Sequence, residues 1–328
     1  MDDTDRKLIR LMCENPRIHL RELAKKLGIS SQAAHHRMQV LKETEAILSP
    51  IAGISVHYLG AIPIAVFGRS DATSTKETLD GLGESEFTRA AIVAGGSQIF
   101  VLGELRNMSE LASYAEFVRR VAKMPEPIVG IYCLDDGLCP SFLVDGVTKF
   151  KQSYKKLTLL DLRIIASLRD DVRRPIADIA NMVGASTKTV RRHLEKMISD
   201  GSLALDVSGN PTYGGDVEAL VHVSLRNSAD KGVVGRRLLS KYPLHIAYIR
   251  SFGNLPKFLL CVFYGNKLSE ILKVLREVEE DPDVVAVMPN ITCAYRLYET
   301  WRHKLPAVMI ASAKGTRTHR HRSGHWTQ

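Results

Sequence analysis

Two segments of the sequence, residues 31–43 and 187–199, carry hydrogen-bonding side chains along one side of a predicted helix. In the first segment, apolar residues recur at Ala34, Met38 and Leu41, so the polar side chains point the other way. The outward residues are Ser31, Gln32, His35, His36, Arg37, Gln39 and Lys42 in the first segment, and Thr187, Lys188, Arg191, Arg192 and Lys196 in the second. Arginine can bind guanine through two hydrogen bonds, glutamine prefers adenine, and lysine neutralises phosphate. These faces could therefore bind base edges and phosphates. A solvated helix face is the alternative that the pattern leaves open.

Each segment is the third of three expected helices. Apolar spacing predicts helices over 4–14, 19–27 and 31–43 in the first set, and over 158–168, 175–183 and 187–199 in the second. The second helix of each set ends at Gly28 or Gly184, and Ser30 or Ser186 then caps the third. A helix, a short glycine-containing turn and another helix make up a helix-turn-helix. The alternating stretches 47–54 and 203–213 are expected to add a wing hairpin to each.

The two sets of helices are copies of one unit. A single shift of 156 residues, without a gap, superimposes Asp5 on Asp161, Ala24 on Ala180, Gly28 on Gly184 and Ser30 on Ser186. Two unrelated helical segments would not also share the glycine turn. The sequence therefore predicts a tandem repeat.

The rest of each copy follows the order strand, helix, strand, strand, helix, strand. These elements are expected near 61–69, 75–83, 86–94, 98–105, 108–122 and 127–134, and again near 217–226, 231–241, 244–252, 257–264, 267–280 and 284–293. The order is that of a ferredoxin-like βαββαβ module, whose antiparallel sheet has helices on one face. The bare faces of the two sheets are expected to pack on each other.

The predicted fold class is therefore α+β, with two repeats of a winged helix-turn-helix and a ferredoxin-like βαββαβ module. The expected divisions are winged helix-turn-helix domains at 1–50 and 157–212, βαββαβ modules at 51–140 and 213–298, a linker at 141–156 and a tail at 299–328.

The net charge of +9 says little about the folded modules, because residues 300–328 carry six basic residues and no acidic one. We expect this basic tail to be disordered from Trp301 onward and to make non-specific phosphate contacts. There is no apolar run of about eighteen residues that could span a membrane, so a cytoplasmic protein without membrane contact is expected. The scattered cysteines and histidines do not have zinc-site spacing, and we expect neither a metal nor a cofactor.

The segments LRELAKKLGISSQAAHHRMQVLKETEAI and IADIANMVGASTKTVRRHLEKMISDGSL, each followed by a βαββαβ module, resemble the Lrp/AsnC (feast/famine) regulators. The resemblance implies a prokaryotic transcription regulator with a ligand-sensing module, called the RAM or AsnC domain, that also dimerises. Members of this family usually carry one unit per chain. A tandem copy predicts an intrachain pseudo-dimer and leaves open whether two chains also pair as a homodimer.

The resemblance places a small-molecule effector, an amino acid or a related compound, at the turn between the second and third strands of each module. The residues expected there are Gly95, Gly96, Ser97 and Gln98 in the first copy, and Gly253 and Asn254 in the second. Glycine lets a backbone N–H approach a carboxylate closely, although a hairpin glycine can also serve the turn alone. Ile99 and Lys257 stand near the position of the family's usual acidic residue, which is a departure from the pattern.

The resulting expectation is a sequence-specific regulator that binds double-stranded DNA, reads two dissimilar half-sites, and is not an enzyme. The alternative is an enzyme like the sirohaem decarboxylases, which resemble the same two-module unit. Such an enzyme needs a basic pocket and a proton donor. The candidates His222, His245, Tyr248 and Arg250 are not expected to converge.

Overall fold

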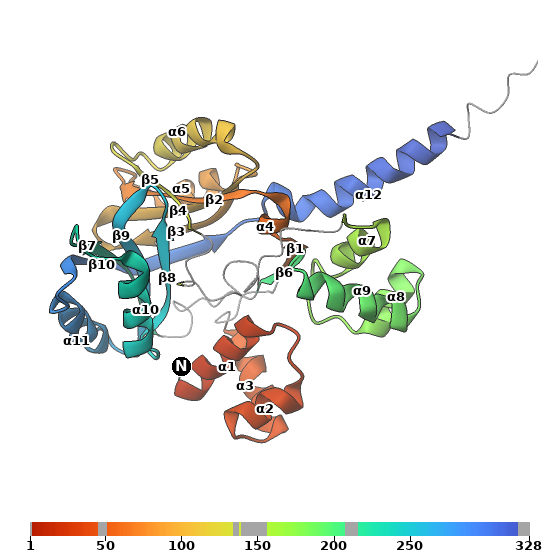
Figure 1. Cartoon of the computed structure of the whole chain (residues 1–328), viewed down its shortest axis with the longest axis horizontal. Helices are drawn as coiled ribbons and strands as arrows, with labels where there is room; N and C mark the ends of the chain where they lie inside the picture. The colour runs from red at the N-terminus through yellow and green to blue at the C-terminus, as the bar shows by residue number, and fades with distance from the viewer. Residues whose placement is uncertain (1, 45–50, 134–137, 139–155, 207–215, 321–328) are drawn as a thin grey trace, which may run out of the picture.

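The computed structural model describes residues 2–44, 51–133, 138, 156–206 and 216–320 (Figure 1). The remainder of the expected wing stretches, at 47–50 and 207–213, lies outside the described residues, as does the expected linker apart from residue 156.

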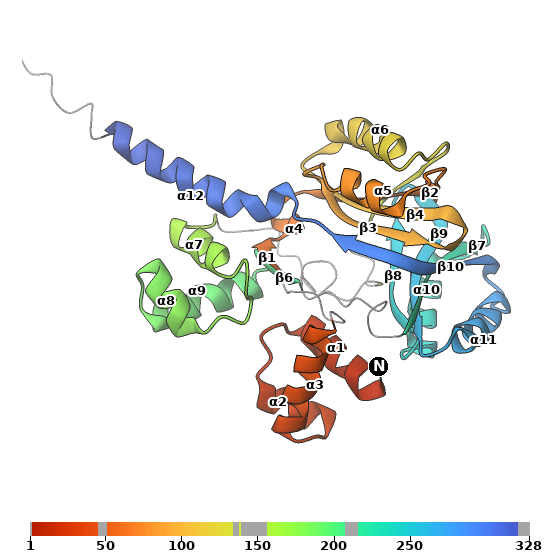
Figure 2. The ribbon, with the colours of Figure 1, turned by 180° about the vertical axis from the view of Figure 1, so that it is seen from behind.

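Two helix-turn-helix domains lie on one side of a β-sheet assembly (Figures 1 and 2). The first consists of α1 (Asp3–Glu14), α2 (Leu20–Leu27) and α3 (Ser31–Glu43), and the second of α7 (Leu159–Ser167), α8 (Ile176–Val183) and α9 (Thr187–Ser199). Gly28 and Gly184 close α2 and α8 with φ of 68° in each case. This left-handed conformation suits glycine, and the expected turn is present in both copies.

The strands that follow α3 and α9 do not form separate wing hairpins in the described residues. Instead β1 (Ile51–Ile54) pairs antiparallel with β6 (Leu203–Asp206), so that Ile54 lies opposite Leu203. The two repeats therefore share one small sheet. The expected wing hairpins stay a prediction, because the remainder of both stretches lies outside the described residues. Within the described residues, each of these strands pairs with the other copy.

The βαββαβ modules form a single eight-stranded antiparallel sheet in the order β5-β2-β4-β3-β10-β7-β9-β8. The first module contributes β2 (Ile62–Arg69), α5 (Thr75–Leu82), β3 (Thr88–Ala94), β4 (Gln98–Leu105), α6 (Leu111–Val121) and β5 (Ile128–Ile131). The second contributes β7 (Val217–Leu225), α10 (Lys231–Lys241), β8 (Ile246–Phe252), β9 (Leu255–Gly265), α11 (Leu268–Glu279) and β10 (Val284–Leu297). Short segments α4 (Val56–Leu59), η1 (Gly95–Ser97) and η2 (Met108–Glu110) connect them.

Both edges of each module's sheet are joined to the other module. The long strand β10 pairs with β7 through Ile291 and with β3 from Thr292 onward (Figure 2). At the opposite junction, the Gly253 N–H donates to the Ile131 carbonyl (2.8 Å) and the Cys133 N–H to that of Ser251 (3.0 Å). These contacts close the sheet into a barrel, so the modules share their edges as well as the expected buried face.

Aromatic rings fill the middle of the barrel. Phe67, Phe100, His222 and Phe258 form a ring cluster with centroid separations of 5.0 to 5.7 Å. Phe67 lies on β2 and His222 on β7, the first strand of each module. The His222 Nε2 atom is buried without a hydrogen bond, and desolvation lowers the pKa of this histidine to about 4. On the outside, α5 and α6 cover one half of the sheet, and α10 and α11 cover the other.

The tail that was expected to be disordered begins as a helix, α12 (Trp301–Arg320), which lies beside α7. Its first turn is anchored by a buried ion pair, in which Arg302 donates to the Glu104 carboxylate at 2.9 and 3.2 Å. Thr300 donates to the same carboxylate at 2.6 Å, and the Trp301 indole donates to the Glu104 carbonyl at 2.8 Å. The prediction of a disordered tail was wrong for this first turn, because the basic composition of the tail does not indicate which of its residues bind the Glu104 carboxylate. Residues 321–328 lie outside the described part.

The Glu104–Arg302 pair should be a major contributor to stability. Burial alone would raise the Glu104 pKa, but the attraction of Arg302 prevails and lowers it to about 2. Arg302→Leu leaves this carboxylate buried without its main cation, and we expect a loss of about 3–5 kcal/mol. Urea unfolding followed by Trp301 fluorescence measures it. Arg119→Ala, which breaks an exposed pair with Glu116, is the control and should leave the midpoint unchanged. An equal midpoint for both variants would refute the assignment.

His222 should make the fold sensitive to acid. The ordinary histidine pKa is 6.5 and the folded value is about 4, so below pH 6.5 the unfolded chain binds a proton that the folded chain excludes. Stability is therefore lost as the pH falls from 6.5 toward 4. His222→Phe, which puts a ring that cannot be protonated among the neighbouring phenylalanines, should lose less stability across this range. Unfolding midpoints at several pH values test it, with exposed His36→Ala following the parent. Parallel pH curves for the parent and His222→Phe would contradict the expectation.

Candidate nucleic-acid interface

The outward face of α9 is basic and exposed to solvent. Val190, Leu194 and Met197 bury the other face in the domain core. The residues of α9 that are predicted to contact DNA are all exposed, namely Thr187, Lys188, Arg191, Arg192 and Lys196. Within the described part of the chain, none of the four cationic side chains forms an ion pair. The arrangement leaves these cations free to meet an anionic partner.

The outward face of α3 is polar with a different chemistry. Its exposed residues are Ser31, Gln32, His35, His36, Gln39 and Lys42. Arg37 differs from them because its guanidinium donates to the carboxylates of Asp5 and Asp2, each at 2.7 Å. The hydrogen bonds to Asp5 and Asp2 raise the Arg37 pKa. A phosphate contact by Arg37 stays a prediction, and this pair would compete with it.

The same contact recurs in the second copy between residues that the sequence reasoning missed. His193 Nδ1 lies 2.6 Å from the buried Asp161 carboxylate, which also caps α7 together with Thr158. Burial raises the Asp161 pKa, but the hydrogen bonds from Thr158 and His193 outweigh it and the net shift is downward. The 156-residue shift places Asp161 on Asp5 and His193 on Arg37. The alignment of the repeats therefore indicated that these two pairs are equivalent. Each pair ties a recognition helix to the start of its domain.

The expected effector turn of the first copy adopts an unusual backbone. It forms η1, in which Gly96 has φ of 67° and Ser97 φ of 61°. The Ser97 carbonyl accepts from the Ser70 N–H at 2.8 Å, and Gln98 begins β4. Gly95 lies close to β10, with the Ile291 carbonyl 3.9 Å from where a Cβ would stand. A ligand role for this turn stays a prediction.

The corresponding residues of the second copy take part in closing the barrel. Asn254 accepts from the Ile131 N–H at 2.8 Å and donates to the Val129 carbonyl at 2.7 Å, and Gly253 donates to β5 as described above. Ligand binding at Gly253 and Asn254 also stays a prediction, but it would have to displace these contacts.

The sequence analysis missed a buried polar cluster inside the barrel, which consists of Glu218, Tyr264 and Thr292. The buried Glu218 carboxylate accepts a hydrogen bond from Thr292 at 2.7 Å and is hydrogen-bonded to Tyr264. Burial raises the pKa of both Glu218 and Tyr264. Sequence alternation places Glu218 on the same face of β7 as His222, but nothing in the sequence indicates that β9 and β10 meet it there. A buried carboxyl with a raised pKa can hold and deliver a proton.

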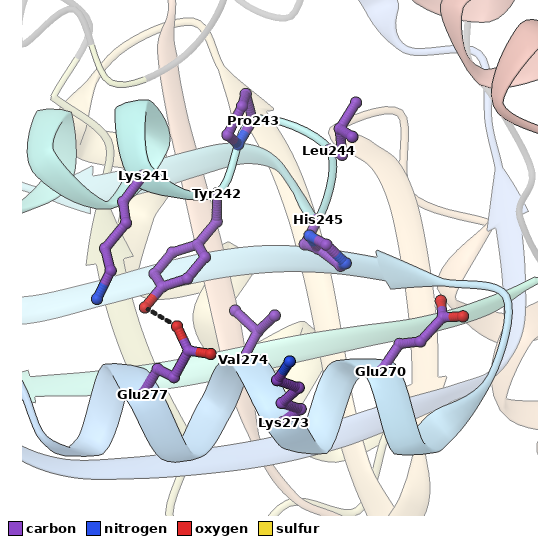
Figure 3. Close-up of a pocket in the computed structure, with 9 residues that line it drawn as sticks. All are labelled: Lys241, Tyr242, Pro243, Leu244, His245, Glu270, Lys273, Val274 and Glu277. Carbon is purple, nitrogen blue, oxygen red and sulfur yellow. Dashed lines mark hydrogen bonds between the residues drawn. The ribbon is translucent and has the colours of Figure 1, made fainter.

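A shallow pocket of about 420 Å³ lies between α11 and the turn that precedes β8 (Figure 3). Its lining residues are Lys241, Tyr242, Pro243, Leu244, His245, Glu270, Lys273, Val274 and Glu277. His245 therefore lies outside the barrel, whereas His222 lies within it and Arg250 stacks on Tyr132 and Tyr248. The four candidates for proton transfer do not form one site. Among the described residues, no three His, Cys, Asp or Glu side chains gather as metal ligands.

Comparison with known proteins bears on both predicted modules. Residues 1–47 and 157–201 match the family of winged helix-turn-helix DNA-binding domains. Both matches fall within the two expected winged helix-turn-helix regions, whose boundaries stay a prediction, and they agree with the resemblance to the Lrp/AsnC regulators. No curated protein sequence matches the chain. In the part of the chain that the structure describes, no helix has the length and apolar character to cross a membrane.

The solved structure of one enzyme shares the fold along nearly the whole chain, and other solved structures match a smaller part of it. The siroheme decarboxylase NirDL is 12% identical, with a TM-score of 0.58, over 95% of this chain and 100% of its own. Its complex with an iron-uroporphyrin III analogue gives 13% identity and a TM-score of 0.57, over 94% and 99%. AsnC of E. coli is 17% identical with a TM-score of 0.35, over 43% of this chain and 94% of its own.

These comparisons overturn one expectation. The sequence analysis expected the chain not to be an enzyme, but the fold that extends over its whole length is that of an enzyme, NirDL. The presence of two helix-turn-helix domains therefore does not exclude catalysis. The expected α+β class is confirmed. The chain thus contains two regions that match the family of winged helix-turn-helix DNA-binding domains, together with paired βαββαβ modules, and it shares its overall fold with siroheme decarboxylase NirDL.

Proposed function

We propose that the chain is a sequence-specific transcription regulator that reads two dissimilar DNA half-sites, one with each recognition helix. The observation that carries the proposal is the contrast between two exposed faces at equivalent places in the repeats. Helix α9 presents Arg191 and Arg192, whereas α3 presents histidines and glutamines.

The two faces favour different bases. Arg191 or Arg192 can bind guanine in bidentate fashion, and Gln32 or Gln39 suits adenine. Lys42, Lys188 and Lys196 add phosphate contacts that carry no sequence information. A symmetric homodimer reads a palindrome, but a pseudo-dimer with unlike helices prefers two unlike half-sites about one helical turn apart.

A single chain is the proposed functional unit. The sheet edges that a second chain could pair with at β3 and β8 are already paired within the chain. We assign the effector response to the first copy, at the turn from Gly95 to Gln98, where Gly96 and Ser97 have left-handed backbone and are exposed, as a site for an amino acid or related anion requires. The equivalent turn of the second copy is engaged with β5.

Arg191→Ala combined with Arg192→Ala should weaken specific binding by about 1–3 kcal/mol for each arginine–guanine pair that the substitutions remove, or roughly 5- to 150-fold in Kd. The target is first recovered by selection from random duplexes. Electrophoretic mobility shifts at several salt concentrations then compare the variant with the parent. The matched control is Arg119→Ala with Arg120→Ala, which removes two adjacent exposed arginines from α6. Equal binding by both double variants would refute the assignment of α9 as a reader.

A decarboxylase that acts on a polycarboxylate tetrapyrrole is the second candidate. The fold shared with NirDL favours it, and so does the Glu218–Tyr264 pair. Loss of carbon dioxide leaves an electron pair on carbon, which must receive a proton. A carboxyl with a raised pKa can supply that proton. Because the four rings at its centre occupy the middle of the barrel, the macrocycle would have to bind toward the end that holds Glu218.

Anaerobic incubation with sirohaem tests this candidate. If the proposal holds, the Soret band shifts on binding and mass spectrometry shows a product lighter by one carbon dioxide. Glu218→Gln should retain the Soret shift and lose product formation, whereas Glu277→Gln in the outer pocket should behave as the parent. Unchanged sirohaem and an unshifted spectrum with the parent protein would reject the enzymatic function.

A further inference from the structure

The two helix-turn-helix domains touch each other through a reciprocal pair of arginines, Arg17 and Arg173. Arg17 donates to the carbonyls of Val172 and Arg174, the latter at 2.9 Å. Arg173 donates to the carbonyls of Pro16 and Ile18, at 2.9 and 2.7 Å. Each arginine thus binds the residues that flank the other. We name these four hydrogen bonds the arginine clamp.

The clamp obeys the same symmetry as the repeat. The 156-residue shift superimposes Arg17 on Arg173, Pro16 on Val172 and Ile18 on Arg174. The contact is therefore of the isologous kind that joins the subunits of a symmetric dimer, but here it lies within one chain. Such a contact fixes one relative orientation, because both arginines must satisfy their two acceptors together.

The guanidinium groups give up hydration to make the clamp. Both arginines are partly buried, and desolvation lowers the pKa of each. The nearby charge of Arg173 lowers that of Arg17 further. The acceptors are neutral carbonyls, so no carboxylate accepts the four bonds. The charge of Asp171 opposes the downward shift at both arginines, and the four hydrogen bonds hold the two guanidinium groups in one geometry, which makes the contact cooperative.

Each loop in the clamp is fixed to its own domain core. Ile18 is buried with Leu8 and Leu23 in the first domain, and Val172 is buried with Ile165 in the second. The recognition helices pack on the same cores, through Met38 in α3 and Leu194 in α9. The clamp therefore connects α3 to α9 through rigidly packed segments.

In the described part of the chain, the first domain has a self-contained apolar core. Its apolar cluster contains only residues between Leu8 and Leu41, whereas the cluster of the second also includes Ile54, Leu305 and Met309. Outside the clamp, the side-chain contact described between the first domain and the barrel is Arg6 with Asp216 (3.1 Å) and Asn266 (2.6 Å).

From this geometry we propose that Arg17 and Arg173 are positioning residues that set the separation and orientation of the two recognition helices, and with them the spacing between the two DNA half-sites. The inference rests on the proposed DNA-reading function. Without the clamp, the first domain is held by its chain connection and by Arg6, and it can reach half-sites at several spacings.

The experiment has one arm without DNA and one with it. Spin labels on non-canonical amino acids at positions 43 and 199, which are equivalent and exposed, report the distance between α3 and α9 while the native cysteines remain. In the second arm, the parent and variants select from duplexes in which the two recovered half-sites are separated by spacers of every length across two helical turns. The variant is Arg17→Ala with Arg173→Ala. The control is Arg10→Ala, which breaks an exposed pair with Glu14.

We expect the parent and control to show one narrow distance and one preferred spacing. The clamp variant should show a broad distance distribution, accept several spacings, and bind the preferred duplex about tenfold more weakly, because the effective concentration of the second domain at its half-site falls. Each half-site alone should bind equally to the parent and the variant.

The two arms separate the possible failures. If the variant keeps a narrow distance and the parent's spacing preference, the clamp inference alone is overturned. If the distance broadens but neither protein selects paired half-sites, the DNA-reading function is refuted and the inference with it. Circular dichroism of the variant verifies that both domains remain folded. If the clamp variant unfolds, Arg17→Lys takes its place and should broaden the spacing preference, because lysine cannot span both carbonyls.

Discussion

Every free edge of a β-sheet carries amide and carbonyl groups that need partners, and the two modules of this chain use each other's edges to supply them. Strand β10 meets β3 at one junction, and the segment around Ile131 meets β8 at the other. Gly130 allows this second junction, since a Cβ there would lie 2.2 Å from the Phe252 ring. The rest of the architecture follows from this closure, because it places the equivalent parts of the two copies opposite each other.

The closure joins each module to the other at both edges, but the two DNA-binding domains are attached differently. The second domain extends its apolar core onto β1 and α12, so burial of Ile54 and Leu305 fixes its position. The first domain buries its apolar residues among themselves and meets the barrel through polar contacts at Arg6. A single set of polar contacts yields less net stabilisation than burial of several aliphatic side chains. One chain thus holds a firmly attached domain and a more loosely attached one.

The local part of the fold could be predicted from the sequence, because its signals lie within a few residues of one another. Gly28 and Gly184 end helices, Ser30 and Ser186 begin them, and one shift relates the copies. The exposed face of α9 was likewise predictable from Val190, Leu194 and Met197. What could not be predicted depends on pairing between distant segments. Whether β1 folds back or joins β6 leaves no mark on its own sequence, since both choices satisfy the same backbone groups.

The candidate sites divide in the same way, into those formed by residues near one another in the sequence and those assembled from distant segments. The residues predicted to contact bases could be chosen from the sequence because, in each copy, they lie on one helix, and that role stays a prediction. The Asp161–His193 contact could have been inferred from the alignment of the repeats. The Glu218 cluster could not be inferred in this way, because it is assembled from β7, β9 and β10. The disorder expected of the tail was predicted wrongly for another reason. Its composition is typical of a solvated segment, yet Arg302 is almost completely buried, with 1% of its surface exposed.

The ion pair between Glu104 and Arg302 also affects when the chain can finish folding during synthesis. The carboxylate emerges from the ribosome long before its cation, since the two are separated by 198 residues. At synthesis rates of roughly 5–20 residues per second, the delay is about 10–40 seconds. During that interval the first barrel half has an acidic side chain that it cannot yet bury and two sheet edges without partners. The nascent chain must therefore remain partly open until its last helix is made.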